Sequence, residues 1–128
     1  MKMLRRNKVY TYGVFDLLHY GHIRSLKQAK KLGKHLTVGV FTDEVVERFK
    51  RKPILTQEER MANIKELGIA DKVVLQKTFI PRDRKGIICK GEGAGWTTEP
   101  MKFKKAKSVL LKYTKGISTS EIIKRIKC

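Results

Sequence analysis

The sequence has few cysteines and no long apolar run. Its two cysteines, Cys89 and Cys128, are too few and too far apart for a disulfide framework, and neither has a cysteine or histidine neighbour at the spacing of a metal cluster. Its longer apolar stretches, such as residues 36–41, fall well short of the roughly 20 residues that a membrane-spanning helix needs. The sequence therefore predicts neither a disulfide-rich secreted domain nor a transmembrane segment.

A secretion signal is not visible near residue 1. Residues 1–8 are basic, as the start of such a signal is, but residues 9–18 are interrupted by Thr11, Gly13 and Asp16. They also offer no cleavage site of small residues. We therefore expect a cytoplasmic protein.

Acidic residues are few compared with basic residues. The sequence has 12 Asp and Glu against 30 Lys and Arg, which gives a formal net charge of +18. Such an excess attracts partners that carry phosphate: nucleotides, nucleic acid or acidic lipid. The basic residues are scattered and are not interleaved with the aromatic rings that single-strand binders use for stacking. The charge thus indicates a phosphate-bearing ligand without identifying it, and many lysines are expected to be simply solvated.

Short apolar segments alternate with helical patterns along the chain. Strands are predicted at residues 8–12, 35–41, 72–75, 86–89 and 108–112. Helices are predicted from the loop before Ile23 to Gly33, over 43–49, from Thr56 to Gly68, and from Ser118 onward, with Thr56/Glu59 and Ser118/Glu121 as capping boxes. Residues 76–101, rich in glycine and proline, are expected to be irregular loop around the short strand.

This order of elements predicts the fold class. The segment 35–41 is almost continuously apolar, as in a parallel strand that is covered on both faces. Strand and helix alternation then indicates an α/β, doubly wound, Rossmann-like parallel sheet of five strands with helices on both faces. We expect one domain over residues 1–128, with ligands bound beyond the carboxyl ends of the strands.

The segment between the first strand and the first helix carries two histidines. His19 and His22 are three residues apart at a predicted helix N-terminus, so both imidazoles can face one anion, and Gly21 lets the backbone approach it. Imidazole N–H groups and the positive helix end suit an in-line phosphoryl displacement, in which charge builds on the phosphate oxygens. The alternative is that they are ordinary polar residues of a helix start, or that one of them is a core histidine whose hydrogen bonds are satisfied. No protein-bound metal is expected, because a third ligand would have to come from distant His35 or a lone cysteine.

Two segments resemble the signatures of a known enzyme family. Residues 12–22, Tyr-Gly-Val-Phe-Asp-Leu-Leu-His-Tyr-Gly-His, resemble the first signature of the cytidylyltransferase family, within the HxGH nucleotidyltransferase superfamily. Residues 114–120, Thr-Lys-Gly-Ile-Ser-Thr-Ser, resemble its second. The likeness is strong over 9–60, clear again over 114–126, and greatest to the glycerol-3-phosphate cytidylyltransferases.

The resemblance implies a transfer of CMP from CTP to a small phosphorylated alcohol, glycerol 3-phosphate, with release of pyrophosphate. It also implies Mg²⁺ or another divalent cation, bound mainly through the nucleotide phosphates, and a homodimer. His19 and His22 would stabilise the pentacoordinate α-phosphate, and Lys50 would contact a reacting phosphate. The acceptor side would hold Asp16, Lys52 and Arg60, with Asp16 orienting either the loop or the acceptor. The residues implied around the nucleotide are Tyr12, Gly13, Val14, Phe15, Gly21, Trp96, Gly116, Ile117, Ser118 and Thr119.

Two departures from the family pattern leave the nucleotide open. The family's Gly-Asp-Asp-Trp is replaced by Gly-Glu-Gly-Ala-Gly-Trp at residues 91–96, and Tyr113 stands where the family commonly has an arginine. The alternatives are an adenylyltransferase of the same superfamily that uses ATP, or a basic nucleic-acid-binding module with a degenerate active site.

Overall fold

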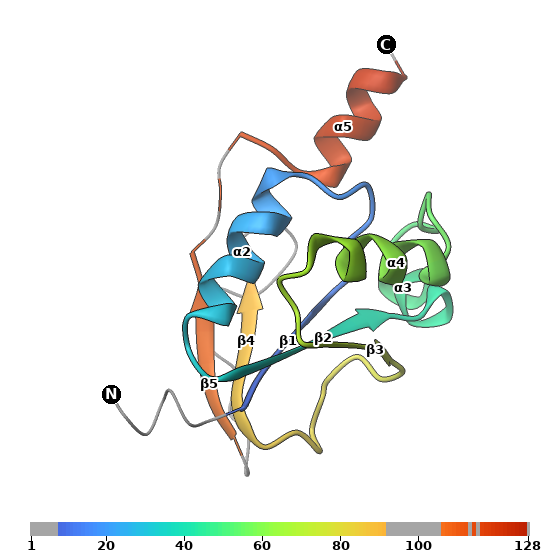
Figure 1. Ribbon diagram of the computed structural model, residues 1–128. Coiled ribbons are helices and arrows are strands. Elements are labelled where there is room, and N and C mark those ends of the chain that lie inside the picture. Colours follow the sequence, from blue (N-terminus) through green and yellow to red (C-terminus); the bar gives the residue numbers. More distant parts are fainter. Residues whose placement is uncertain (1–7, 92–105, 113, 115, 128) are drawn as a thin grey trace.

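The protein folds around one parallel sheet. The computed structural model describes residues 8–91, 106–112, 114 and 116–127. The described elements are β1 (Lys8–Gly13), α2 (Tyr20–Lys30), β2 (His35–Phe41), α3 (Asp43–Phe49), α4 (Gln57–Leu67), β3 (Lys72–Gln76), β4 (Gly86–Gly91), β5 (Ala106–Leu111) and α5 (Thr119–Ile126). The five strands pair in parallel in the order β3-β2-β1-β4-β5 (Figure 1), which confirms the predicted doubly wound α/β sheet.

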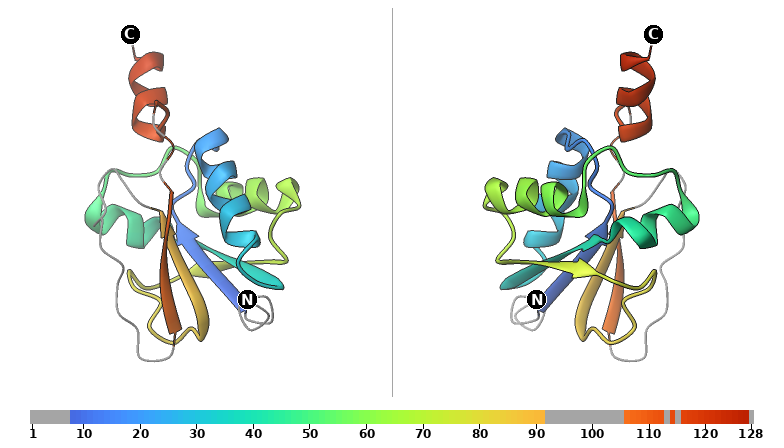
Figure 2. Two further views of the ribbon diagram at one scale, coloured as in Figure 1. Left: turned by 90° about the vertical axis from the view of Figure 1, so that its left-hand side faces the viewer. Right: turned by 90° about the vertical axis from the view of Figure 1, so that its right-hand side faces the viewer.

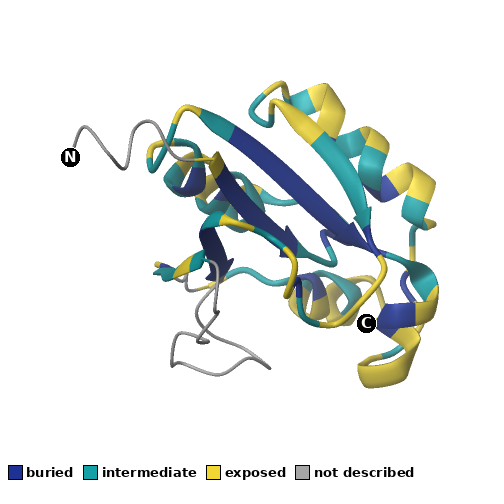
Figure 3. Ribbon diagram, turned by 90° about the horizontal axis from the view of Figure 1, so that it is seen from below, coloured by how far each residue is buried: buried dark blue, intermediate teal, exposed yellow. Residues whose placement is uncertain are grey.

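Helices cover both faces of the sheet (Figure 2). On one face, Leu26 and Ala29 of α2 and Ile64 of α4 pack with alternate strand residues such as Val38. On the other face, α3 packs its valines against Phe41. Side chains of a strand alternate between its faces, so a strand covered on both must be apolar throughout. The central strands β1 and β2 are accordingly buried along most of their length (Figure 3).

Most helix ends follow their predicted caps. Thr56 and Glu59 exchange both bonds of the capping box before α4, and Gly68 ends that helix in the left-handed conformation with φ of 69°. The Ser118 hydroxyl caps α5 by accepting from the Glu121 N–H at 3.1 Å. The other half of the predicted capping box, a bond from the Ser118 N–H to the Glu121 carboxylate, is not among the described bonds of this helix end. That carboxylate instead lies 3.8 Å from Arg125 Nε. The helix α2 ends at Lys30, before its predicted stop at Gly33.

The glycine- and proline-rich region is partly ordered as a strand. Within residues 76–101, β4 reaches Gly91, two residues beyond the predicted end of that strand, while residues 77–85 connect β3 to β4 as a loop. Gly86 begins β4 with φ of 89°, and a Cβ there would lie 2.4 Å from the carbonyl oxygen of Lys8. Glycine is therefore required at this position by a close strand approach. Residues 92–101 lie outside the described part of the chain.

The helices of the described ranges are short. None of them has the length and apolar content needed to cross a lipid bilayer.

Candidate active site

A pocket of about 160 Å³ lies beyond the carboxyl end of β1. It is bounded by the β1–α2 loop, the first turns of α2, the segment after α3, the end of β5 and the start of α5. This is the edge at which ligands bind in doubly wound sheets. The lining residues are Thr11, Gly13, Val14, Phe15, Asp16, His22, Ser25, Leu26, Lys50, Arg51, Leu111 and Thr119.

The two histidines form a reciprocal cap at the start of α2. The Nδ1 atom of His19 accepts from the N–H of Gly21 at 3.1 Å, and the Nδ1 atom of His22 accepts from the N–H of His19 at 3.2 Å. Their rings stack with centroids 3.9 Å apart. A neutral imidazole that accepts at Nδ1 carries its proton at Nε2. Each ring is therefore fixed as a hydrogen-bond donor through Nε2.

Both imidazoles are held in the neutral form. Burial, joined by repulsion from His19 and Lys50 and opposed by a smaller effect of Asp16, lowers the pKa of His22 to about 3. Burial also lowers the pKa of His19. At neutral pH the pair therefore offers N–H donors without positive charge.

The β1–α2 loop has an unusual backbone. Phe15 and Leu17 adopt positive φ angles of 55° and 48°, a region that residues other than glycine seldom occupy. The turn places the Phe15 ring edge-on to His22, with centroids 5.6 Å apart, and over Gly13, where a Cβ would lie 3.2 Å from that ring. Such strain persists where the surrounding structure imposes it, commonly at functional sites. Here it keeps the loop close around the pocket.

Gly21 keeps the histidine cap close to the segment before α5. A Cβ at Gly21 would lie 2.9 Å from Cε1 of His19 and 3.3 Å from a methyl carbon of Ile117. Any side chain at this position must displace the His19 ring or Ile117. The two sequence signatures thus meet in space at Gly21 and Ile117.

Asp16 organises the segment after α3. Its carboxylate is buried and accepts from the backbone N–H groups of Ile54 and Leu55 at 2.8 and 2.9 Å. Of the two roles considered for Asp16, orienting a loop or the acceptor, the described contacts correspond to the loop.

Arg51 is a pocket residue that the sequence prediction did not include. Its Nη1 lies 3.4 Å from a carboxylate oxygen of Asp16, and its Nη2 is buried without a hydrogen-bond partner. A buried guanidinium nitrogen without a partner is costly unless a ligand supplies one. Arg51 lies between two lysines in the sequence, and nothing in the sequence separates it from them. Its contact with Asp16 and its buried Nη2 are seen only in the structure.

The two lysines beside Arg51 are placed differently. Lys50 lines the pocket near His22, and loss of hydration, followed by repulsion from Arg51, lowers its pKa. Lys52 is exposed and does not line the pocket.

The structure places Arg60 in the interior rather than at the acceptor side that the resemblance implied. Its side chain is fully buried, and its guanidinium donates to the carbonyl oxygens of Val14, Phe41 and Leu55 and to the Asp43 carboxylate. The resemblance placed Arg60 at the acceptor, but these contacts leave it no exposed face toward one. It ties the β1–α2 loop to the end of β2 instead.

The start of α5 joins the site through one hydrogen bond. The Thr119 hydroxyl donates to the carbonyl oxygen of Asp16 at 2.5 Å, and Thr119 lines the pocket. Ser118, the N-cap of α5, and Gly116, with φ of 88°, are on the same segment. The free N–H groups of the helix start therefore lie beside the β1–α2 loop, as predicted for an anion site.

The remaining predicted residues lie elsewhere. The Tyr12 side chain is buried in the cluster on the α3 face, opposite the face that packs α2, where burial raises its pKa to about 12. Its side chain is thus not a lining group of the pocket. Trp96, Tyr113 and Lys115 are outside the described residues, so the structure does not place them.

Known proteins resemble this chain over a range that includes both signature segments. A family model described as "Cytidylyltransferase-like" matches residues 10–125. A solved structure described as the lipopolysaccharide core biosynthesis protein from Thermoplasma volcanium GSS1 is similar with a TM-score of 0.67 and 28% identity. That likeness covers 87% of this chain and 98% of the other.

Curated relatives match over all or part of the chain. Choline-phosphate cytidylyltransferase 2 of Arabidopsis thaliana is 34% identical over 93% of this chain and 44% of its own length. FAD synthase of Thermococcus sibiricus is 47% identical over 59% of the chain and 51% of its own length. Glycerol-3-phosphate cytidylyltransferase of Bacillus subtilis is 40% identical over 56% of each protein. The match therefore spans only about half of each of these relatives.

Proposed function

The chain belongs to the cytidylyltransferase-like family, and we propose that it transfers CMP from CTP to a small phosphorylated alcohol, with glycerol 3-phosphate as the acceptor. The observation that carries the proposal is the pair of neutral imidazoles, His19 and His22, each fixed as an Nε2–H donor beside a cationic pocket. Relatives named for choline phosphate and glycerol 3-phosphate support an acceptor of this class.

The reaction needs donors and alignment more than a general base. An oxygen of the acceptor phosphate attacks the α-phosphorus of the nucleotide, and the bond from that phosphorus to the oxygen bridging to the β-phosphate breaks. The electron pair leaves with pyrophosphate. The attacking oxygen carries no proton at neutral pH, so none has to be removed. The histidines stabilise the negative charge that builds on the equatorial α-phosphate oxygens.

The cations have separate places around this centre. Lys50 and Arg51 line the pocket on the side of the α3–α4 segment, where they would neutralise the reacting phosphates. Lys52 remains a proposed acceptor contact at the exposed side. Backbone of residues 13–15 and the N-terminal N–H groups of α5 would surround the nucleotide phosphates.

The donor set fits a divalent cation that arrives with the nucleotide. Asp16 is the acidic residue among those that line the pocket, and its two oxygens already accept hydrogen bonds from Ile54, Leu55 and Arg51. We therefore propose that Mg²⁺ would be held mainly by phosphate oxygens, where it would neutralise charge on the departing pyrophosphate.

Use of ATP is the second candidate. The relative with 47% identity is an FAD synthase, whose product contains an adenylyl group joined to a phosphate. The catalytic groups described above act on the α-phosphate and do not distinguish the bases.

Pyrophosphate release tests both candidates. The protein is incubated with Mg²⁺ and each of the four nucleoside triphosphates, with glycerol 3-phosphate, choline phosphate or flavin mononucleotide as acceptor. Release with CTP and glycerol 3-phosphate is the expected result, and release with ATP and flavin mononucleotide would favour the second candidate. No release above background in any combination would contradict the proposed activity.

We also propose that the protein acts as a homodimer in the cytoplasm. Sedimentation velocity would test the dimer, and fractionation of the source cells would test the location.

A further inference from the structure

One face of α2 is turned toward β5 and the start of α5. Gly21, Ser25 and Gln28 follow one another at intervals of four and three residues, so they lie on the same side of the helix. Gly21 lies beside Ile117, and Ser25 lines the active-site pocket together with Thr119. Gln28 contacts the chain at the point where it leaves β5. This face of α2 therefore connects the histidine cap with the second signature.

The side-chain amide of Gln28 pairs with both backbone groups of Lys112. Its Nε2 donates to the carbonyl oxygen of Lys112 at 3.1 Å, and its Oε1 accepts from the N–H of Lys112 at 2.8 Å. Lys112 directly follows β5, which is an edge strand of the sheet. An uncharged amide carries a donor and an acceptor side by side, so it can satisfy the N–H and the C=O of one residue at once. Gln28 therefore fixes the direction in which the chain leaves the sheet.

Contacts at three places attach the chain between β5 and α5 to the unit formed by β1 and α2. They join Gln28 to Lys112, Gly21 to Ile117, and Asp16 to Thr119. The first contact consists of two hydrogen bonds, the second of close packing and the third of one hydrogen bond. The two histidines belong to the same unit, since they cap α2. The position of the α5 start relative to the histidines therefore depends on these contacts.

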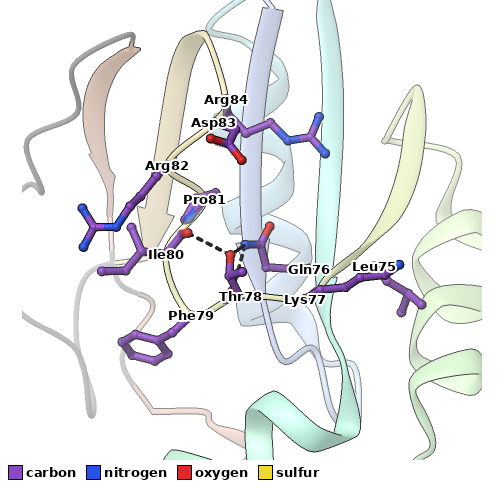
Figure 4. Close-up of a pocket in the computed structure, with 10 residues that line it drawn as sticks. All are labelled: Leu75, Gln76, Lys77, Thr78, Phe79, Ile80, Pro81, Arg82, Asp83 and Arg84. Carbon is purple, nitrogen blue, oxygen red and sulfur yellow. Dashed lines mark hydrogen bonds between the residues drawn. The ribbon is translucent and has the colours of Figure 1, made fainter.

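A larger hollow elsewhere on the surface is separate from this connection. It has a volume of about 740 Å³ and lies at the loop between β3 and β4 (Figure 4). The residues that line it form one continuous segment, 75–84, which includes none of α2, β5 or α5. The hollow therefore does not brace the chain that leads to α5.

We propose that Gln28 is a positioning residue for nucleotide binding, whose amide holds Lys112 so that the N–H groups at the start of α5 face the nucleotide phosphates. This inference rests on the proposed function, in which α5 contributes to the nucleotide site. A site that is correctly formed in only a fraction of the molecules binds its ligand with an affinity reduced by that fraction. Loss of the amide pair therefore weakens nucleotide binding and leaves the step at the α-phosphorus unchanged once the nucleotide is bound.

Isothermal titration calorimetry of the full chain with CTP and with ATP, each in the presence of Mg²⁺, tests the role of Gln28. Gln28→Met keeps the length and the neutrality of the side chain and removes both hydrogen bonds. The Kd of the nucleotide that wild type binds is expected to rise about fivefold. The KM for that nucleotide should rise by the same factor, while kcat and the KM for the acceptor stay unchanged.

The matched control is Gln57→Met. Gln57 is half-buried, as Gln28 is, and its Oε1 accepts from the backbone N–H of Asp43 at 2.9 Å, which joins α4 to α3. The control thus removes a glutamine-to-backbone bond that does not involve either signature. Its nucleotide Kd should stay close to that of wild type.

Three outcomes would overturn the positioning role: an unchanged Kd in Gln28→Met, equal rises in Gln28→Met and Gln57→Met, or a lower kcat with an unchanged Kd. If Gln28→Met does not fold, Gln28→Glu replaces it, with Gln57→Glu as its control. Glutamate keeps an acceptor for the N–H of Lys112 and loses the donor, so the nucleotide Kd should again rise more at position 28 than at position 57.

Pyrophosphate release by wild type is a separate readout. Wild type that binds a nucleotide and releases no pyrophosphate would contradict the proposed activity alone, because the binding comparison still decides the role of Gln28. Wild type that binds neither nucleotide would overturn both proposals.

Discussion

The backbone N–H of His19 donates to Nδ1 of His22, 3.2 Å away, so the first histidine of the pair orients the second. Each ring uses Nδ1 on the backbone and keeps Nε2 for a ligand. A residue that imitates only one of these two nitrogens can therefore separate the structural role of the histidines from their chemical role.

Replacing His22 by Gln or Asn should give different losses. The Gln amide can place a donor near the position of Nε2, whereas Asn can imitate only the capping atom Nδ1. His22→Asn and His22→Ala should lower kcat by about 100-fold or more, and His22→Gln by clearly less. Steady-state kinetics with CTP would measure this, and His19 should behave similarly. Losses in nucleotide binding as large as those in turnover would contradict the proposed role.

Gly21→Ala should reduce turnover without unfolding the protein. The new methyl group would lie 2.9 Å from the His19 ring and would turn it out of register with His22. Gly68→Ala is the control. Its positive φ of 69° disfavours any residue with a side chain, but the added methyl group would meet no neighbouring atom. The control should lose roughly 1 kcal/mol of stability and keep its kcat. Equal kcat values for the two variants would argue against a role for His19 orientation.

Stability should fall as the pH is lowered from about 6.5 toward 3. The unfolded chain protonates His22 below pH ~6.5, whereas the folded chain does so only near pH 3, because burial lowers the pKa of His22 to about 3. The unfolded state thus binds more protons in this window, so the free energy of unfolding falls as the pH is lowered and rises as the pH is raised. Urea unfolding of wild type and His22→Gln at pH 7 and pH 4 would show a smaller pH effect in the variant. The same pH effect in both proteins would contradict the prediction.

Arg60→Met should destabilise the fold by about 3 kcal/mol or more, because it leaves three carbonyl oxygens, that of buried Phe41 among them, and the Asp43 carboxylate without their donor. Arg48→Met breaks the exposed pair with Glu44 and should cost below about 1 kcal/mol. Urea midpoints would measure both. An Arg60 variant as stable as wild type but with a raised KM for the acceptor would restore the acceptor-binding role implied by the family resemblance.

Arg51→Gln should lower kcat/KM by about tenfold or more, since its buried Nη2 would meet a phosphate oxygen when substrates bind. Lys52→Gln removes the same charge from an exposed side chain and should have a smaller effect. Titration of each substrate in turn would show which phosphate Arg51 contacts. A larger loss at Lys52 than at Arg51 would reverse the assignment of the two cations.

The fold followed from local patterns, whereas parts of the site did not. Continuous apolar strands and the cap at Thr56 predict their elements because each acts over a few residues. The burial of Arg60 could not be predicted locally, because an arginine in the first turn of a helix is normally solvated. Its position four residues before the buried Ile64 places it on the same helix face, which is the one signal that could have indicated burial.

Long-range pairing explains the remaining differences. The partners of Arg51 and Gln28 are Asp16 and Lys112, each more than thirty residues away in the chain. No spacing rule links such residues, because their contact depends on the order of strands in the sheet. The two histidines of the cap, in contrast, are only three positions apart, so their shared place at the start of a helix could be predicted from the sequence.

The bond between Thr119 and Asp16 has a consequence for the biosynthesis of the protein. A ribosome produces the β1–α2 loop early, but the residue that seals the loop against α5 emerges after more than a hundred further residues. The nascent polypeptide can therefore acquire the histidine cap long before the pocket is complete, and a chain whose translation stopped before residue 119 would carry the signature histidines in an unfinished site.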